Sequence, residues 1–519
     1  MTLLIDIPAP SRHPLALLRD PATIRVRCAA VLHSVEGNNS ANFRLDRDAL
    51  GAVADRVAAL TLRRFPDLRI PLHSRWRHFE AGGIDRKAEL DALLQGRDRT
   101  ERARVHFDLT VLSVLLDAGA GPRWHYTESK VLDALAMPAQ HHGSDDLLAL
   151  LDRAARTKTA TAAAPTEAAA VEGGGAASRA VDAAENVDRV ADGVADGVAH
   201  GVADGISDPI AETPPAASPP SPDGPVQRPS YTRSEGLGVA TFRAFMAGAF
   251  SSHRDDALRC DASALQAVDA AALRGVFQAT PSNPMVGLEG RAGLISRLGE
   301  ALAAEAARDG VPARPGLLFD RITDGGQRSQ VSAAEMLGEV LRVFAPIWKG
   351  GSLVQGLPAG DVWAHRWAGD ETGSGERNPT TGGWVPFHKL SQWLCYSLVE
   401  PLQWAGVAVT GLDALTGLPE YRNGGLLLDG GVIVPRNPRD LERTWNAGDE
   451  FVVEWRALTV VLLDELAVLV RQRLGRTAEH LPLACILEGG TWAAGRELAK
   501  ELRSDGAPPL KIDSDGTIF

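Results

Sequence analysis

The stretch FVVEWRALTVVLLDELAVLVRQRL, residues 451–474, is the most apolar helix candidate in the chain. Glu454 and Arg456 interrupt its apolar run near the start. Charged groups in such surroundings are costly to bury unless they are paired and hydrogen-bonded. Two interpretations are equally open. In the structural one, the two residues form an ion pair or lie at a helix end still in water. In the functional one, the arginine and the carboxylate face a binding site.

Helical patterns continue on both sides of this stretch. Apolar residues recur at helical spacing in RDALGAVADRVAALTLRRF (47–65), HFDLTVLSVLLDAGAG (106–121) and VSAAEMLGEVLRVFAPIW (331–348). WVPFHKLSQWLCYSLVEPLQWAG (384–406) predicts a helix with Pro386 near its start and Pro401 near its end. LLLDGGVIV (426–434) fits a short strand or hairpin. The predicted fold class is mainly α with little β.

Composition limits the classes of function. The chain has 519 residues, enough for two or three packed units, and a net charge of −12. An acidic surface argues against a general nucleic-acid binder but allows a small basic pocket for one phosphate. Four cysteines lie far apart without a CxxC pair, which fits a reducing, cytoplasmic compartment. We expect no signal peptide, no membrane span and no metal site.

A compositional break divides the chain. Residues 156–230 contain alanine-rich sequence, a four-residue repeat in VADGVADGVAHGVADG and the proline-rich TPPAASPPSPDGP. So few large apolar side chains cannot bury enough surface to offset chain entropy, which predicts a disordered insertion. It separates an N-terminal helical part, residues 1–153, from a C-terminal helical part, residues 231–519, that carries the predicted active site.

Polar residues follow one face of the helix predicted from Pro386. Lys389, Gln392 and Tyr396 recur at helical spacing, with His388 just before them. Such a stripe is usually a solvated face, but its mixture of Gln, Tyr and Lys also fits the wall of a pocket.

TGLPEYRNGGLLLDGG, residues 416–431, combines polar side chains, bare backbone and a leucine run. We expect the leucines to anchor the segment in the core while its polar members face a ligand, with Gly424 and Gly425 admitting close backbone contact. A buried turn with internal ion pairs is the alternative. Trp124, in VLLDAGAGPRWHYTES (114–129), is expected in a loop over the pocket.

HSRWRHFEAGG, residues 73–83, concentrates histidine, arginine and aromatic side chains. His73 and His78 are five positions apart, which does not suit two metal ligands on one helix face. Anion binding by Arg75 or Arg77 is more plausible, and a plain surface loop is the simplest reading.

Seven segments together resemble an uncharacterised family of uracil-catabolism proteins: HSRWRHFEAGG, DLTVLSVLLDAGAGPRWHY, RSEGLGVATFRAF, PFHKLSQWLCYSLVEPL, LTGLPEYRNGGLLLDGGV, VEWRALTVVLLDELA and LEGGTWAAGRE. Its members often carry the label uracil phosphoribosyltransferase, and the pathway proceeds through ribosylurea. A more distant resemblance is to the queuosine-nucleotide N-glycosylases, whose helical fold is related to DNA glycosylases. It rests on Glu420-Tyr421-Arg422 and Glu454-Trp455-Arg456.

These resemblances imply hydrolysis of an N-ribosidic bond, most specifically of 5-phosphoribosyl-urea to urea and ribose 5-phosphate, by a helical glycosylase-like core. The bond breaks with positive charge on the sugar, which a carboxylate beneath the ring stabilises. Glu420 is assigned that role, with Asp429 in reserve. Candidate proton donors to urea are Tyr421, Lys389 and His388. Further residues expected to bind substrate are Gln392, Arg422, Asn423, Glu454, Arg456 and Trp124.

Two other functions stay open. A uracil phosphoribosyltransferase would use a doubly wound sheet, against which the helical pattern argues. A non-catalytic metabolite-binding protein of the same pathway would bind ligand without turnover. The expected partner is a small phosphorylated, ribose-containing substrate, and no cofactor is expected.

Overall fold

The computed structural model describes residues 15–117, 119–121, 123–128, 229–348, 351–369 and 381–513. Chain segments on both sides of residues 155–227 belong to one compact unit, so the predicted N-terminal and C-terminal parts fold together. The predicted insertion lies outside the described residues except for its last two positions, Pro229 and Ser230.

Helices make up most of the described residues, which confirms the mainly α class. They are α1 (Pro21–Glu36), α2 (Ala49–Arg64), α3 (Trp76–Phe79), α4 (Arg86–Leu93), α5 (Arg99–Leu115), α7 (Arg233–Met246), α8 (Ala262–Ala267), α9 (Ala270–Val276), α10 (Leu288–Asp309), α11 (Leu317–Thr323), α12 (Ala333–Phe344), α13 (Lys389–Trp404), α14 (Tyr421–Asp429), α15 (Glu450–Leu474), α16 (Leu483–Ile486) and α17 (Trp492–Leu502). A π-helical turn, Leu487–Thr491, joins α16 to α17.

The strands of the described chain form two-stranded ladders and no larger sheet. Four ladders are antiparallel: β1 (Phe43–Leu45) with β10 (Ile433–Pro435), β2 (His125–Thr127) with β3 (Ser230–Thr232), β5 (Leu353–Val354) with β6 (Leu357–Pro358), and β7 (Val362–Ala364) with β8 (Trp384–Pro386). Two are parallel: β4 (Gln330–Ser332) with β9 (Ala408–Thr410), and β11 (Thr444–Asn446) with β12 (Lys511–Asp513).

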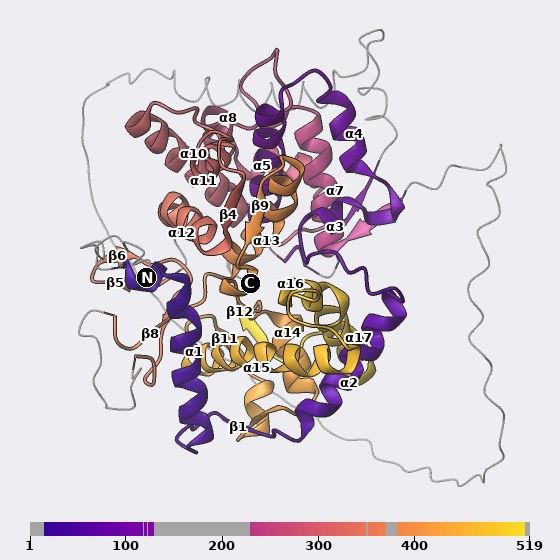
Figure 1. The fold of residues 1–519 in the computed structure, drawn as a ribbon, viewed down its shortest axis with the longest axis vertical. Coiled ribbons are helices and arrows are strands. Elements are labelled where there is room, and N and C mark those ends of the chain that lie inside the picture. The colour runs from indigo at the N-terminus through magenta and orange to yellow at the C-terminus, as the bar shows by residue number, and fades with distance from the viewer. Residues whose placement is uncertain are drawn as a thin grey trace, which may run out of the picture. The chain divides into compact units, whose positions relative to one another are not determined.

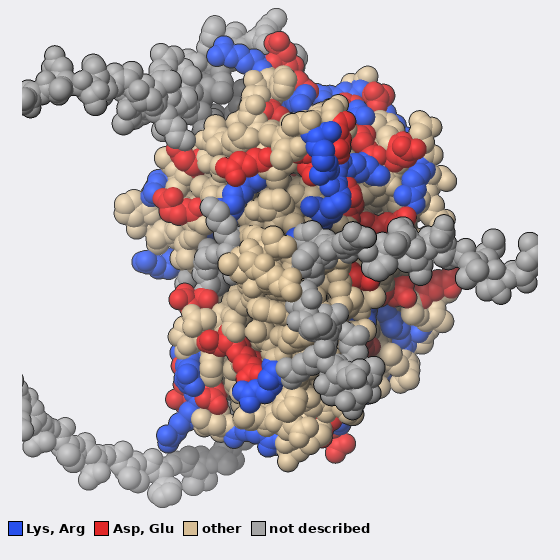
Figure 2. Space-filling view, turned by 90° about the vertical axis from the view of Figure 1, so that its left-hand side faces the viewer, with Lys and Arg blue, Asp and Glu red and all other residues tan. Residues whose placement is uncertain are grey.

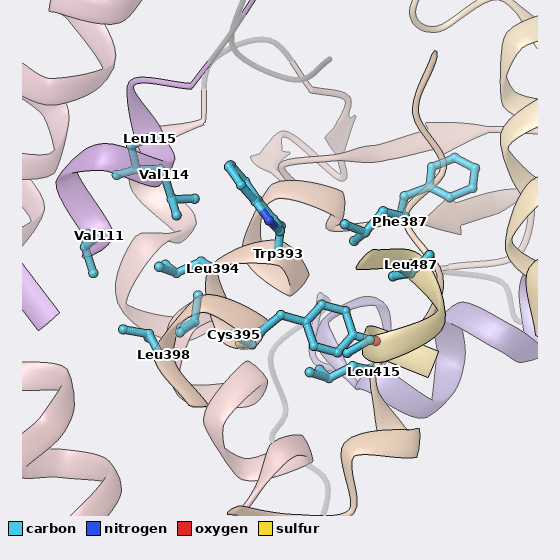
Figure 3. Close-up of a cluster of buried hydrophobic side chains, with 14 of the residues drawn as sticks. Val111, Val114, Leu115, Phe387, Trp393, Leu394, Cys395, Leu398, Leu415 and Leu487 are labelled. Atoms are coloured by element: carbon cyan, nitrogen blue, oxygen red, sulfur yellow. The ribbon is translucent and has the colours of Figure 1, made fainter. Parts of the chain in front are cut away.

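The helices gather in two groups on either side of the middle of the molecule (Figure 1). One group packs α15 against α1, α2 and α14, and crosses α14 with α17. The other packs α5 against α7 and α11, and α10 against α8. Helix α13 lies against α5 and α12, and Figure 3 shows Leu394 and Leu398 of α13 near Val111, Val114 and Leu115 of α5. One apolar core runs through both groups.

Helix α15 has the boundaries that its sequence predicts. Glu450 lies in its first turn and arginines lie in its last, where each charge favours the helix dipole. Gly475 ends it in the left-handed conformation, with φ at 61°. Apolar side chains are buried around the whole circumference, as expected for a helix in the centre of a helical group.

Two local predictions need correction. LLLD is not a strand: Leu426–Asp429 form the second half of α14, and only Ile433–Pro435 are extended, in β10. The helix predicted from Pro386 begins at Lys389, because Pro386 belongs to β8 and His388 takes a left-handed conformation with φ at 47°. No helix in the described ranges is both long and apolar enough to span a bilayer.

The ends of the undescribed segment meet in the β2–β3 ladder. Tyr126 lies opposite Tyr231, and Glu128 N donates to Pro229 O over 3.0 Å. We predict that replacing residues 160–222 with a short Gly/Ser linker will change the free energy of unfolding by less than about 1 kcal/mol, since loop-closure entropy varies slowly with loop length. Urea unfolding of both proteins measures this. Loss of soluble protein would show that the segment contributes to the core.

Candidate functional site

Helix α13 positions the segment that leads into α14. Gln392 Nε2 donates to Thr416 Oγ1 and Thr416 N donates to Gln392 Oε1, both over 2.7 Å. The Tyr396 hydroxyl donates to Thr416 O over 3.1 Å. Gln392 and Tyr396 are fully buried. The polar stripe of this helix therefore does not face solvent, and it fixes the backbone just before Glu420.

Glu420 is the N-cap residue of α14, and its side chain is half-buried. One carboxylate oxygen accepts from Arg422 N over 2.8 Å, and the other accepts from Asn423 N over 2.7 Å. The positive end of the helix dipole favours the charged carboxylate here. Asn423 is buried and structural, since it donates to Leu418 O and accepts from Thr491 Oγ1.

Lys389 begins α13 and is half-buried. Within the described ranges, no hydrogen bond or ion pair reaches its ammonium group. Burial lowers the pKa of Lys389, and the Glu420 carboxylate is the strongest influence in the opposite direction. Lys389 and Glu420 therefore act on each other through space, although they come from different helices.

Arg456 is paired with Asp361, a residue that the sequence did not suggest. Its two terminal nitrogens donate to the two Asp361 oxygens over 2.7 and 2.8 Å, and its guanidinium lies 4.1 Å from the centre of the Phe387 ring. Burial alone would raise the pKa of Asp361, but Arg456 and further donors hold it at about 2. Because Lys389 N also donates to Asp361, this pair fixes the start of α13.

Glu454 lies on the other side of α15 from Arg456, because residues two apart point about 200° apart around a helix. Its carboxylate accepts from the Ser40 hydroxyl and from Asn42 Nδ2, and it lies 3.3 Å from His365 Nε2. Glu454 and Arg456 thus form neither an ion pair nor one site. Each has its own partners, and the glutamate belongs to a buried structural network.

Three more predicted members lie in other surroundings. Asp429, at the far end of α14, forms a bidentate pair with Arg503. His388 Nε2 donates to Leu18 O over 2.7 Å. Trp124 is fully buried and donates to Phe277 O over 2.8 Å, so it packs in the core rather than in a loop over a pocket.

Tyr421 and Arg422 complete the group that the structure brings together with Glu420 and Lys389. Tyr421 is half-buried, and burial together with Glu420 raises the pKa of its hydroxyl to about 12. Arg422 is half-buried and donates to Gly506 O over 3.2 Å. We call these four residues, Lys389, Glu420, Tyr421 and Arg422, the Glu420 cluster.

The glycines of α14 serve helix packing rather than ligand contact, contrary to the expectation from sequence. A Cβ on Gly424 would lie 2.3 Å from the buried Trp455 ring. A Cβ on Gly425 would lie 3.1 Å from Pro509, which is a much milder approach. The adjacent leucines are buried as predicted.

The segment at residues 73–83 is not a surface loop, because His73, Arg75, Trp76 and Phe79 are buried. Arg75 Nη1 donates to Asp117 over 2.7 Å, and His73 Nδ1 lies 2.9 Å from Glu488. In the part of the chain that the structure describes, no three His, Cys, Asp or Glu side chains gather as a metal site would require.

A surface pocket of about 400 Å³ lies at the opposite end of α13 from Lys389. Its walls come from α3, α4, the turn between them and the end of α13, and they include Trp76, Glu80, Glu400 and Trp404. None of its lining residues belongs to the Glu420 cluster.

Comparison with known proteins shows which family the chain is similar to. Residues 17–138 and 223–519 match a family described as "Protein of unknown function (DUF1688)". The chain belongs to the DUF1688 family. The match includes the Glu420 cluster and omits residues 139–222, most of the predicted insertion.

Two relatives are similar over nearly their whole length. "Protein urg3" of Schizosaccharomyces pombe is 31% identical, over 98% of this chain and 100% of its own. "Uracil catabolism protein 4" of Lachancea kluyveri is 29% identical, over 98% of this chain and 99% of its own.

Sequence reasoning missed Asp361, which follows a glycine in an unremarkable loop. The available signal was indirect, since a buried arginine in an apolar helix requires a carboxylate from elsewhere in the chain. No pattern in the sequence indicates which of many aspartates supplies it.

We predict that Gly424→Ala will lower the free energy of unfolding by about 1–3 kcal/mol, because the new methyl group must displace the Trp455 ring. Gly425→Ala is the matched control and should be near neutral, since better helix propensity offsets its milder contact. Denaturant unfolding measures both. Equal losses in the two variants would contradict this account of the α14 packing.

We predict that acidification from pH 6.5 to pH 4 will destabilise the fold. Burial and the neighbouring Arg75 lower the pKa of His78 from 6.5 to about 4. In this window the unfolded imidazole binds a proton that the folded one excludes, so the free energy of unfolding falls as pH falls. His78→Asn should flatten this slope in denaturant titrations at several pH values. An unchanged slope would show that His78 is not responsible.

Proposed function

We propose that this chain hydrolyses an N-ribosidic bond in uracil catabolism, and that its substrate is 5-phosphoribosyl-urea. The name of the Lachancea kluyveri relative, "Uracil catabolism protein 4", supports the pathway, because that protein is similar over 98% of this chain. The main structural support is the Glu420 cluster. In it the fixed carboxylate of Glu420 acts on the half-buried Lys389, whose ammonium group has no acceptor among the described residues.

Glu420 is suited to stabilise positive charge on the sugar. Two backbone donors hold its oxygens in place, and the segment before it is tied to α13. A preorganised carboxylate stabilises an oxocarbenium-like transition state without reorganising when the charge appears. Water then supplies the hydroxyl group that joins the anomeric carbon as the carbon–nitrogen bond breaks.

Lys389 is the better proton donor of the two neighbours of Glu420. Urea leaves well only when its nitrogen receives a proton. Burial lowers the pKa of Lys389, which makes its ammonium a stronger acid, whereas the pKa of Tyr421 rises to about 12. Lys389 would therefore protonate the departing nitrogen and be recharged by the proton that water loses.

The other predicted donors and ligands have positioning roles in this proposal. The Arg456–Asp361 pair holds the start of α13, and Gln392 holds the segment before Glu420. Arg422 is the proposed ligand of the substrate phosphate, since no carboxylate pairs with it within the described ranges. Phosphoribosyl transfer has less support, because the ladders of the described chain contain two strands each.

We expect the purified chain to release urea from 5-phosphoribosyl-urea and Glu420→Gln to lower kcat at least about 100-fold, as when a transition-state charge loses its stabilising group. Glu442→Gln, an exposed carboxylate outside the cluster, is the control. Urea is assayed directly, with and without a chelator.

Each other result selects another function. Glu420→Gln that keeps the wild-type rate would refute the catalytic assignment. Formation of a nucleotide from uracil and phosphoribosyl pyrophosphate would favour the transferase. Binding of 5-phosphoribosyl-urea without urea release would favour the metabolite-binding protein.

A further inference from the structure

Arg422, beside Glu420, and Arg233 lack the carboxylate partner that several buried arginines have. Arg86, Arg314 and Arg456 are each paired with a buried or half-buried carboxylate. Arg233 and Arg422 are half-buried, yet no ion pair reaches either of them within the described residues. Half-buried guanidinium groups lose part of their hydration. Two such groups without a carboxylate partner therefore favour binding of an anion from solution.

Three helices bring Arg233, Arg422 and a third arginine, Arg496, together. Helix α17 crosses α14 so closely that a Cβ on Gly495 would lie 2.1 Å from Arg422 O. The next residue, Arg496, places Nη1 3.6 Å from Glu235 Oε1 in the first turn of α7. Arg233 is the first residue of that same turn.

The electrostatics agree with this proximity. Burial lowers the pKa of Arg422, and Arg233 and Arg496 are among the positive neighbours that lower it further. Glu420 opposes them and Glu235 is engaged with Arg496, so three arginines are balanced by two carboxylates. Arg496 Nε is buried and has no acceptor. Positive charge is therefore in excess at this point of an acidic protein.

The backbone of α7 adds to the site. Thr232 precedes this 14-residue helix without capping it through its side chain, and Arg233 takes a left-handed conformation with φ at 55°. A strained non-glycine residue of this kind persists where the surrounding structure holds it. The positive end of the helix dipole at this start favours a negative ligand.

We propose that Arg233, Arg422 and Arg496 form a binding site for a phosphate monoester, and, resting on the proposed function, that this site takes the 5-phosphate of the substrate. Glu420 is the N-cap residue, with extended rather than helical backbone, and Arg422 follows two positions later, so their Cα atoms lie within about 7 Å of each other. A pentose phosphate can therefore bridge them, with its phosphate on the arginines and its anomeric carbon at Glu420. On the face drawn in Figure 2, Lys and Arg side chains are interspersed with Asp and Glu, so that face offers no extended basic surface to a long polyanion.

Calorimetric titration of the full chain with ribose 5-phosphate, inorganic phosphate and ribose tests the site without turnover. We expect ribose to bind at least tenfold more weakly than ribose 5-phosphate. Arg233→Gln and Arg422→Gln should each weaken ribose 5-phosphate binding tenfold or more, as the loss of a charge-assisted contact does. Arg476→Gln, which removes an exposed arginine elsewhere, should leave it unchanged. Arg233→Lys provides a conservative second variant, and circular dichroism confirms folding.

Equal affinity for ribose and ribose 5-phosphate, or unchanged affinity in both arginine variants, would overturn the phosphate site. The proposed function fails separately. Arginine-dependent ribose 5-phosphate binding without urea release from 5-phosphoribosyl-urea would keep the site and reject the hydrolysis. Urea release that depends on Glu420 but not on Arg233 or Arg422 would keep the hydrolysis and reject the site.

Discussion

Arg456 lies in the most apolar helix of the chain, where a charge without a partner would be strongly unfavourable. Both oxygens of Asp361 accept from it, and the same carboxylate accepts from Lys389 N and Trp363 Nε1. The pair thus joins α15 to the beginning of α13. Removing one partner of such a pair costs about 3–5 kcal/mol, since the other charge remains buried. The location of Lys389, and so the geometry of the Glu420 cluster, depends on this contact.

Buried hydrogen bonds from α13 and from the π-helical turn fix the backbone on both sides of Glu420. Gln392 and Tyr396 hold Thr416, and Asn423 joins the start of α14 to the π-helical turn through Thr491. All these groups are buried, where hydrogen bonds are directional and costly to break. Polar residues that resemble ligands in the sequence, Gln392 and Asn423 among them, therefore hold the backbone around Glu420.

The candidate site follows from this framework. Glu420 is fixed by backbone donors, Lys389 is unpaired within the described ranges, and Arg233 and Arg496 add positive charge near Arg422. The proposed cleavage of a phosphorylated N-riboside needs a carboxylate for the sugar cation, an acid for the departing nitrogen and cations for the phosphate. The arrangement uses three helix starts, α7, α13 and α14.

Periodicity and hydrophobicity are local properties, so the sequence alone indicated the mainly α class, the central apolar helix and the burial of the leucines in α14. Glu420, Tyr421 and Arg422 are neighbours in the chain, so their proximity follows from it as well. The pairing of Asp361 with Arg456, the separate partners of Glu454, the contact of Trp455 with Gly424 and the approach of Arg233 and Arg496 to Arg422 appear only in the folded chain. Each of these contacts joins residues far apart in the chain. Their partners are selected by how helices cross and by the need to satisfy buried charge, which no local pattern encodes.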